Sequence, residues 1–408
     1  MDTASAHVNR LLLARGLRAF GDGFVSLLLP LYLLELGFGA AAVGVIASAT
    51  LLGSGLLTLA AGLRAHRHHA RTLLLVASAL MAATGLGFAS VHAFWPLLAI
   101  AFVGTLNPSG GDVSVFLPLE HAVLSRVVAD QRRTAAFASY ALVGTLSAAA
   151  GALAAGVPAV VAVATGWPLR TALQWTFVVY AALGGLAALA YRGLPRAPAG
   201  GAPAAKAALG PSRHVVYRLS ALFALDAFGG GFVVQSILAL WLFLRFDLSP
   251  ATAGTIFFAM GVLSAASYLV AVRIARRIGL VNTMVFTHLP ANLCLVAIPF
   301  VPDLAWAIAL LFVRSALSQM DVPTRSSYVM AIVTPDERPA AASVTSVPRS
   351  LAAAASPALA GWMLGLSAFG WPLVVAGATK IAYDLLLLAT FRRLRPPEER
   401  TAEAVRSR

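Results

Sequence analysis

The chain has little cysteine and little charge. Cys294 is the only cysteine in 408 residues, which excludes a disulfide scaffold and argues against a metal site built from cysteines. Charged residues make up 11% of the sequence, whereas soluble domains have about 25%. With 59% hydrophobic residues and a mean hydropathy of +0.83, the composition excludes an ordinary soluble protein and indicates a membrane protein.

Motifs that support catalysis are also missing from the sequence. It has no glycine-rich motif of the kind that holds phosphate, no convincing metal-ligand spacing and no nucleophile signature beside a base. His66, His68 and His69 gather in a short basic segment without a carboxylate, which favours a solvated turn over a metal site. We therefore expect no enzyme, no cofactor and no bound metal.

Long apolar runs divide the chain into membrane spans. A spanning helix takes about 20 residues, and twelve such segments follow one another along the sequence. They lie near 11–36, 41–63, 72–91, 95–124, 135–163, 171–191, 218–244, 250–272, 281–301, 304–333, 341–366 and 371–391. Gly156 and Pro158 indicate a break in the fifth segment. The prediction is an all-α membrane protein with twelve transmembrane helices.

Basic residues lie almost entirely on one side of these spans. The loops and termini of that side contain 22 Lys and Arg residues, and the other side contains only Arg170 and Arg245. Because cytoplasmic loops are the basic ones, both termini are expected in the cytoplasm. The net charge of +14 then fits a lipid bilayer as partner and not nucleic acid. We expect a multi-pass monomer in the cytoplasmic (inner) membrane of a bacterium.

Short sequence patterns recur about half a chain apart. Phe20, Gly21, Gly23, Phe24 and Val25 return as Phe228, Gly229, Gly231, Phe232 and Val233, at an offset of 208. Asp112-Val113 returns as Asp321-Val322, and Gly166-Trp167-Pro168 as Gly370-Trp371-Pro372. Six helices return the chain to the side where it started, so the repeat is parallel, about an axis normal to the bilayer.

The segment 192–218 joins the two copies. It is rich in Pro and Gly and its only charged residues are basic, which is typical of a flexible cytoplasmic linker. The predicted organisation is an N-terminal six-helix bundle at 1–191, the linker at 192–218, a C-terminal six-helix bundle at 219–395 and a cytoplasmic tail at 396–408. The two bundles are expected to surround a central cavity.

This arrangement resembles the major facilitator superfamily over the whole chain. The family's loop signature after the second helix is matched by Gly62, Arg67 and Arg71, although histidines replace its acid and its second glycine. The corresponding stretch of the second half keeps Gly279. The resemblance implies that these four residues serve the gating loops, that the first, fourth, seventh and tenth helices line the cavity, and that the two bundles rock about a midplane site.

Thirteen charged residues lie inside the predicted spans, although each costs about 2.5–3.5 kcal/mol at the bilayer centre. Ten of them are on the first, fourth, seventh and tenth helices. An acid that gains or loses an ion pair during a conformational change can take up or release a proton. The proton-coupling candidates are Asp22, Asp112, Glu120 and Asp321, and the substrate-cavity candidates are Arg18, Asn107, Asp226, Arg314, Arg325 and Arg349.

Several of these charges have a purely structural alternative. Asp22 and Asp112 could form buried pairs with Arg18, Arg314 or Arg325, and Asp321 could close an ion pair with Arg325 one turn away. Lys380 and Asp384 are also one turn apart and are expected to neutralise each other, and Arg10, Arg15 and Glu35 to reach an interface. Before Asp112, the stretch Asn107-Pro108-Ser109-Gly110-Gly111 predicts a discontinuous helix.

The charged helices favour a transporter. We expect a proton-coupled secondary transporter that moves a small organic solute by alternating access, with efflux as the favoured direction. An alternative is a transporter or exchanger of an organic anion or phosphorylated metabolite held by the arginines. A non-transporting membrane receptor is a third possibility, but its cleft is expected to be empty of charge.

Overall fold

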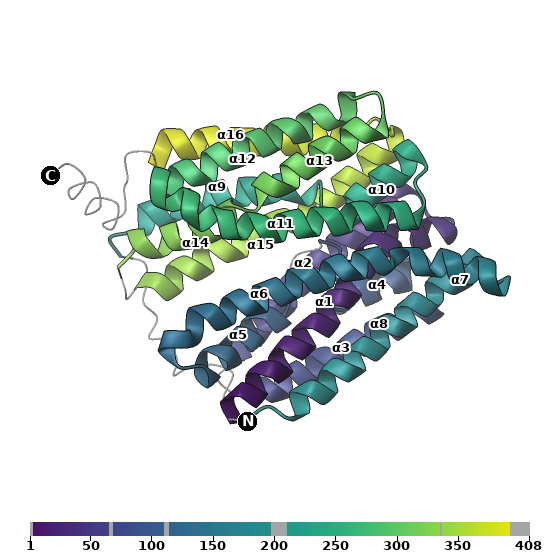
Figure 1. Cartoon of the computed structure of the whole chain (residues 1–408), viewed down its shortest axis with the longest axis horizontal. Helices are drawn as coiled ribbons and strands as arrows, with labels where there is room; N and C mark the ends of the chain where they lie inside the picture. Colours follow the sequence, from purple (N-terminus) through teal and green to yellow (C-terminus); the bar gives the residue numbers. More distant parts are fainter. Residues whose placement is uncertain (1–2, 65–67, 110–113, 197–209, 335–336, 392–408) are drawn as a thin grey trace. The chain divides into compact units, whose positions relative to one another are not determined.

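A computed structural model describes residues 3–64, 68–109, 114–196, 210–334 and 337–391, and every regular element in these ranges is a helix (Figure 1). The elements are α1 (Thr3–Glu35), α2 (Ala40–Arg64), α3 (Ala70–Ser90), α4 (Phe94–Val103), α5 (Phe116–Val127), α6 (Asp130–Leu153), η1 (Ala154–Gly156), α7 (Val157–Thr165), α8 (Leu169–Arg192), α9 (Arg213–Gly231), α10 (Gln235–Phe246), α11 (Pro250–Ile278), α12 (Leu280–Ala297), η2 (Ile298–Phe300), α13 (Leu304–Ser318), α14 (Asp321–Ile332), α15 (Arg338–Leu366) and α16 (Trp371–Phe391).

The chain is an all-α membrane protein. Within the described ranges, nine helical segments are long and apolar enough to cross a membrane. The number twelve stays a prediction, because the expected spans 95–124 and 304–333 each consist of two shorter helices. The expected span 341–366 lies in α15, a helix of 29 residues.

Two predicted interruptions are present. The span that contains Pro108 is helical only to Val103 and again from Phe116, with residues 110–113 outside the described part of the chain. Near Gly156, a 3₁₀ turn separates α6 from α7. Pro removes a backbone donor and Gly weakens a helix, and both effects act at these two places.

Two further interruptions were not predicted. The span 218–244 breaks between α9 and α10, after the run Gly229-Gly230-Gly231, where each glycine costs the helix about 1 kcal/mol relative to alanine. The first-half copy of this run has Asp22 in place of the middle glycine, and α1 continues through it. The span 304–333 breaks at Gln319–Met320, since Pro323 has no N–H to donate to Gln319.

The helices form two compact units, which are described separately. The first contains residues 1–203, 233–261 and 357–368, and in it α1 lies between α6 and α8, while α3 packs on α8 (Figure 1). The second contains residues 204–232, 262–356 and 369–408, and in it α12 packs against α13, α14 and α16. The core of the second unit is built from buried side chains of several helices, among them Phe223, Met284, Tyr328, Tyr383 and Leu387.

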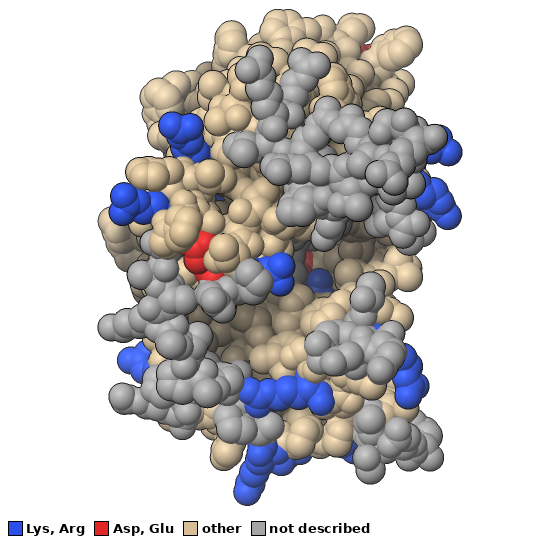
Figure 2. All heavy atoms as spheres, turned by 90° about the vertical axis from the view of Figure 1, so that its left-hand side faces the viewer, with Lys and Arg blue, Asp and Glu red and all other residues tan. Residues whose placement is uncertain are grey.

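Basic residues gather at one end of the helices in each unit. In the first unit these are Arg64 at the end of α2 and Arg192 at the end of α8; in the second they include Arg213 at the start of α9 and Arg277 at the end of α11. The face in Figure 2 carries many blue Lys and Arg side chains and little red of Asp and Glu. This distribution is typical of cytoplasmic loops; the membrane orientation itself stays a prediction.

Two glycines of the internal repeat have the same structural role. A side chain at Gly23 on α1 would overlap the carbonyl oxygen of Ala148 on α6. A side chain at Gly231 on α9 would overlap the carbonyl oxygen of Ala353 on α15. The repeated glycine therefore lets two helix backbones touch once in each unit, as small residues do in membrane helix packing.

We predict that Gly23→Ala lowers the stability of the purified protein by about 1–3 kcal/mol, because the added methyl group overpacks the contact between α1 and α6. Thermal unfolding in detergent measures the effect. Gly185→Ala is the matched control, since no atom lies within 4 Å of a Cβ placed there, and it should be neutral or slightly stabilising. Equal melting temperatures for the two variants would contradict the close contact at Gly23.

Candidate functional site

Each unit buries a cluster of charged and polar side chains. In the first unit, the carboxylate of Glu120 on α5 is bound by side chains from three other helices. Arg18 on α1 and Tyr140 on α6 donate to one of its oxygens, and the Tyr191 hydroxyl on α8 donates to the other at 2.6 Å. Arg18 and Glu120 are 1% and 0% exposed, so they form a buried ion pair and not a solvated one.

The guanidinium of Arg18 is also fixed from other directions. Its Nε lies 3.0 Å from the Tyr191 hydroxyl, and its carbon lies 4.0 Å from the centre of the Phe116 ring. The structure thus brings together two predicted site residues, Arg18 and Glu120. It joins four helices, α1, α5, α6 and α8, through one carboxylate.

Asp22 follows Arg18 by one turn on α1 and is buried as well. Its Oδ1 lies 3.4 Å from the hydroxyl of Tyr180, which donates to the carbonyl oxygen of Thr105 at 3.0 Å. The Oδ1 of Asn107 accepts from the N–H of Ser109 at 3.1 Å, so this amide stabilises the interrupted helix. Asp112 lies outside the described residues.

The sequence predicted that Arg15 reaches an interface, but the structure buries this residue. The residue is only 8% exposed, and its guanidinium lies over the ring of Tyr140 at 5.2 Å. The reason is the neighbouring helix, because Gly144 on α6 leaves room for the guanidinium to lie inward.

In the second unit, the carboxylate of Asp226 on α9 is the centre of the cluster. Its Oδ1 accepts from the ammonium of Lys380 on α16, and its Oδ2 accepts from Nη1 of Arg325 on α14 at 2.9 Å. Nη2 of Arg325 lies 3.2 Å from Asp321, which confirms the predicted pair one turn apart and adds Asp226 to it.

A second carboxylate extends this cluster. Asp384 on α16 is 0% exposed, and its two oxygens lie 2.9 Å from Nδ1 of His288 and 2.8 Å from Nδ2 of Asn292, both on α12. The other ring nitrogen of His288 lies 3.9 Å from Asp226. His288 therefore stands between two buried carboxylates.

The predicted pairing of Lys380 with Asp384 is wrong. The two residues are one turn apart on α16, but Lys380 bonds to Asp226 and Asp384 bonds to His288 and Asn292. Residues of α9 and α12, which are distant in the sequence, are therefore the partners of Lys380 and Asp384, although the two residues are one turn apart. Sequence reasoning missed His288 and Asn292, although two polar residues four apart inside an apolar span are a usable signal.

Two arginines of the second unit have no ion pair within the described part of the chain. Arg349 is exposed on α15, yet close enough to Arg325, Asp226 and Asp321 to interact electrostatically. Arg314 on α13 is partly buried, and its Nε has no hydrogen-bond partner among the described residues. Both were predicted as cavity residues.

The predicted gating-loop residues lie at helix ends. Gly62 is exposed near the end of α2, and Arg71 is in the first turn of α3, whereas Arg67 lies outside the described residues. Gly279 precedes α12 with a φ of 87°, a backbone conformation that favours glycine. Their role in gating stays a prediction.

Glu337 holds the start of α9 from the segment before α15. Its carboxylate accepts from the N–H groups of Gly210 and Ser212 at 2.6 and 3.3 Å and from the hydroxyls of Ser212 and Thr334 at 2.7 and 2.8 Å. The hydrogen bond from the Ser212 hydroxyl, supported by the others, lowers the pKa of Glu337 to about 2. An acid at the positive end of a helix dipole is also favourable.

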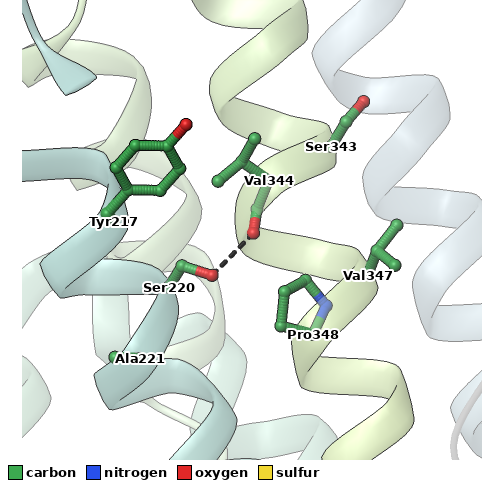
Figure 3. A pocket seen from close by; sticks show the side chains of 7 residues that line it. All are labelled: Tyr217, Ser220, Ala221, Ser343, Val344, Val347 and Pro348. Carbon is green, nitrogen blue, oxygen red and sulfur yellow. Dashed lines mark hydrogen bonds between the residues drawn. The ribbon is translucent and has the colours of Figure 1, made fainter.

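A pocket of about 520 Å³ lies between α9 and α15 in the second unit (Figure 3). Tyr217, Ser220 and Ala221 line it from α9, and the hydroxyl of Ser220 donates to the carbonyl oxygen of Val344 at 2.6 Å. Its other lining residues on α15 are Ser343, Val347 and Pro348. With no charged side chain in its lining, this pocket does not explain the buried charges.

Charged side chains buried among membrane helices are costly, and they are typical of proteins that transport solutes or ions. The sequence profile of the Major Facilitator Superfamily matches residues 11–320. The chain therefore belongs to the Major Facilitator Superfamily, and it is a transporter and not an enzyme. Among the described residues, no group of three or more His, Cys, Asp or Glu side chains could hold a metal ion.

Known proteins share the sequence pattern and the fold. The uncharacterized membrane protein YJR124C of Saccharomyces cerevisiae is 24% identical over 411 residues, which cover 92% of each chain. A solved structure of a mutant of the nucleoside transporter NupG has a TM-score of 0.76 at 14% identity and covers 94% of this chain and 100% of that one. The D-xylose-proton symporter has a TM-score of 0.74 at 13% identity, with 95% and 98% covered. These structures show the same fold.

We predict that Asp226→Asn destabilises the protein by about 3–5 kcal/mol, because Lys380 and Arg325 lose the carboxylate that they share. Asp321→Asn should cost less, since Arg325 keeps Asp226. In a double-mutant cycle measured by thermal unfolding, Lys380→Met should lose less stability in the Asp226→Asn background than in the wild type. Additive losses would show that the two residues are not coupled.

We predict that the stabilisation of the start of α9 by Glu337 depends on pH. The pKa of Glu337 is about 2 in the folded protein and about 4.3 in an unfolded chain, so its contribution to stability is full above about pH 4.3 and is lost as the pH falls towards 2. Glu337→Gln should remove this part of the acid sensitivity of thermal unfolding. Glu35→Gln, at an exposed acid, is the control and should leave the curve unchanged.

Proposed function

We propose that this chain is a proton-coupled secondary transporter of a small organic solute, and that the transported proton resides in the cluster of Asp226, His288 and Asp384. The observation that supports the proposal is the position of His288, whose imidazole can take up and release a proton, between two buried carboxylates.

The charge balance of this cluster favours one bound proton. Asp226, Asp321 and Asp384 supply three negative charges, whereas Lys380 and Arg325 supply two positive charges. A proton on His288 makes the ion-paired group neutral, and neutrality is favoured because unpaired charge is costly away from water. Arg349 adds positive charge at longer range, from an accessible position, and Tyr383 is uncharged at neutral pH.

The connections of the cluster can link the proton to a conformational change. Asp226 is on α9, Arg325 and Asp321 are on α14, His288 is on α12, and Lys380 and Asp384 are on α16. A proton on His288 strengthens its bond to Asp384 and adds a positive charge beside Asp226. The ion pairs of Asp226 with Lys380 and Arg325 then contribute less to neutralising its carboxylate. Protonation thus changes which helices are tied together. Asp22, Asp112, Glu120 and Asp321 stay predicted proton carriers, of which Glu120 already has three donors.

Transport of an organic anion is the second candidate function. It is favoured by Arg314 and Arg349, two cations without an ion pair among the described residues. A guanidinium binds carboxylate or phosphate through paired hydrogen bonds. This function is compatible with the proton cluster, since a bound anion adds negative charge that a proton can offset.

We expect the protein in liposomes to move protons when its solute is added. A pH-sensitive dye inside the liposomes measures this movement while organic acids, nucleosides and sugars are added outside in turn. His288→Gln should abolish the proton movement, because glutamine cannot carry the proton. Exchange of the same solute across the membrane should continue in this variant. A protein inserted in one orientation also tests the direction, which we expect to be export.

The matched control is His92→Gln, which changes an exposed histidine bound to Gln174 and should move protons as the wild type does. Normal proton movement by His288→Gln would remove the cluster from the coupling mechanism. Solute exchange without any proton movement in the wild type would contradict proton coupling itself.

A further inference from the structure

We propose that Arg314 binds the anionic group of the transported solute, so that the substrates are small organic carboxylates or phosphates. The proposal rests on the proposed transport function and adds the class of substrate and a residue that recognises it. It depends on the surroundings of Arg314 in the second unit, which differ from those of the ion-paired cations Arg18, Arg325 and Lys380.

Arg314 lies deep along a membrane helix. It is ten residues from Leu304, the first residue of α13, which places it about 15 Å along the helix. It follows buried Ala307 by seven residues and buried Leu311 by three, so it is on the packed face of α13, whereas Trp306 and Val313 are on the exposed face. Its guanidinium therefore points into the protein and not into lipid.

No carboxylate of the described residues forms an ion pair with Arg314. Arg18, Arg325 and Lys380 each bond to an acid, but the Nε of Arg314 is buried with no hydrogen-bond partner among the described residues. The ionisable neighbour that interacts with it is the thiol of Cys294 on α12. An unpaired buried cation is costly, and an anion that arrives from outside the chain offsets the cost.

Neither Arg314 nor Cys294 is fully buried. Both residues are partly accessible, although the Nε of Arg314 is buried. Five N–H donors in a planar fork match the two oxygens of a carboxylate or a phosphate. A phospholipid headgroup shares this chemistry, but its phosphate lies at the membrane surface, whereas Arg314 lies about half a bilayer core from the helix start.

Cys294 makes the proposal testable without a known substrate. As the only cysteine in the chain, it can be labelled selectively in the purified full-length protein in detergent. Its rates of reaction with the anionic reagent sulfonatoethyl methanethiosulfonate and with the cationic trimethylammonioethyl analogue are compared with their rates on free cysteine. We expect a preference for the anionic reagent of about tenfold, because a cation near the thiol raises the local concentration of anions.

Labelling of variants and competition by anions connect this preference to Arg314. Arg314→Gln should abolish it, Arg314→Lys should keep most of it, and Arg277→Gln, at an exposed arginine, should leave it unchanged. Inorganic phosphate or malonate should slow the labelling of the wild type and not of Arg314→Gln. Phosphatidylglycerol should have no such effect; protection by this lipid alone would assign the site to a headgroup and overturn the proposal.

Other results would also contradict the proposal. A wild-type protein that reacts equally with both reagents has no anion site beside Cys294, and this result is independent of whether Arg314→Gln folds. A thiol that reacts with neither reagent shows that the site does not admit an anion from water. Because the labelling needs no gradient, it can succeed while proton movement in liposomes fails, and the two proposals are thereby distinguished.

Discussion

A carboxylate buried among membrane helices has to be matched by cations, and Asp226 is where this requirement is strongest. Its oxygens take Lys380 from α16 and Arg325 from α14, with His288 of α12 close by. The rotation of each helix about its own axis is fixed by these bonds, because a small rotation moves a charge away from its partner. The apolar core around Phe223 and Tyr383 packs between the same helices.

The first unit meets the same requirement in a different way. At the offset of 208 that relates the two copies, Asp226 corresponds to Arg18, so equivalent positions carry opposite charges. The carboxylate partner of Arg18 is Glu120, whose remaining bonds come from two tyrosines, and tyrosine stays neutral at physiological pH. In the second unit a histidine bonds directly to a carboxylate of the cluster, whereas in the first unit His121 packs on the ring of Tyr140, with 5.1 Å between the ring centres. The repeat therefore conserves the helix arrangement while the chemistry of the two halves differs.

The sequence predicted the helices well because length and apolar composition decide them locally. It also predicted the interruption at Pro108, the turn at Gly156 and the pair of Asp321 with Arg325, which all depend on residues close in the chain. It failed where a distant helix decides the outcome. Lys380 lies one turn from Asp384 but bonds to Asp226, 154 residues away, and no local spacing reveals that choice.

The interruption between α13 and α14 connects the two proposed binding events. In an unbroken helix, Arg314 and Asp321 would be held about 10 Å apart on one face. The break at Gln319–Met320 puts them on separate helices instead, with Asp321 in the first turn of α14, where the helix dipole favours an acid. An anion at Arg314 and a proton in the Asp226 cluster thus act on two helices that meet at a bend. Because the helix is interrupted there, α13 and α14 are not held to each other as one continuous helix.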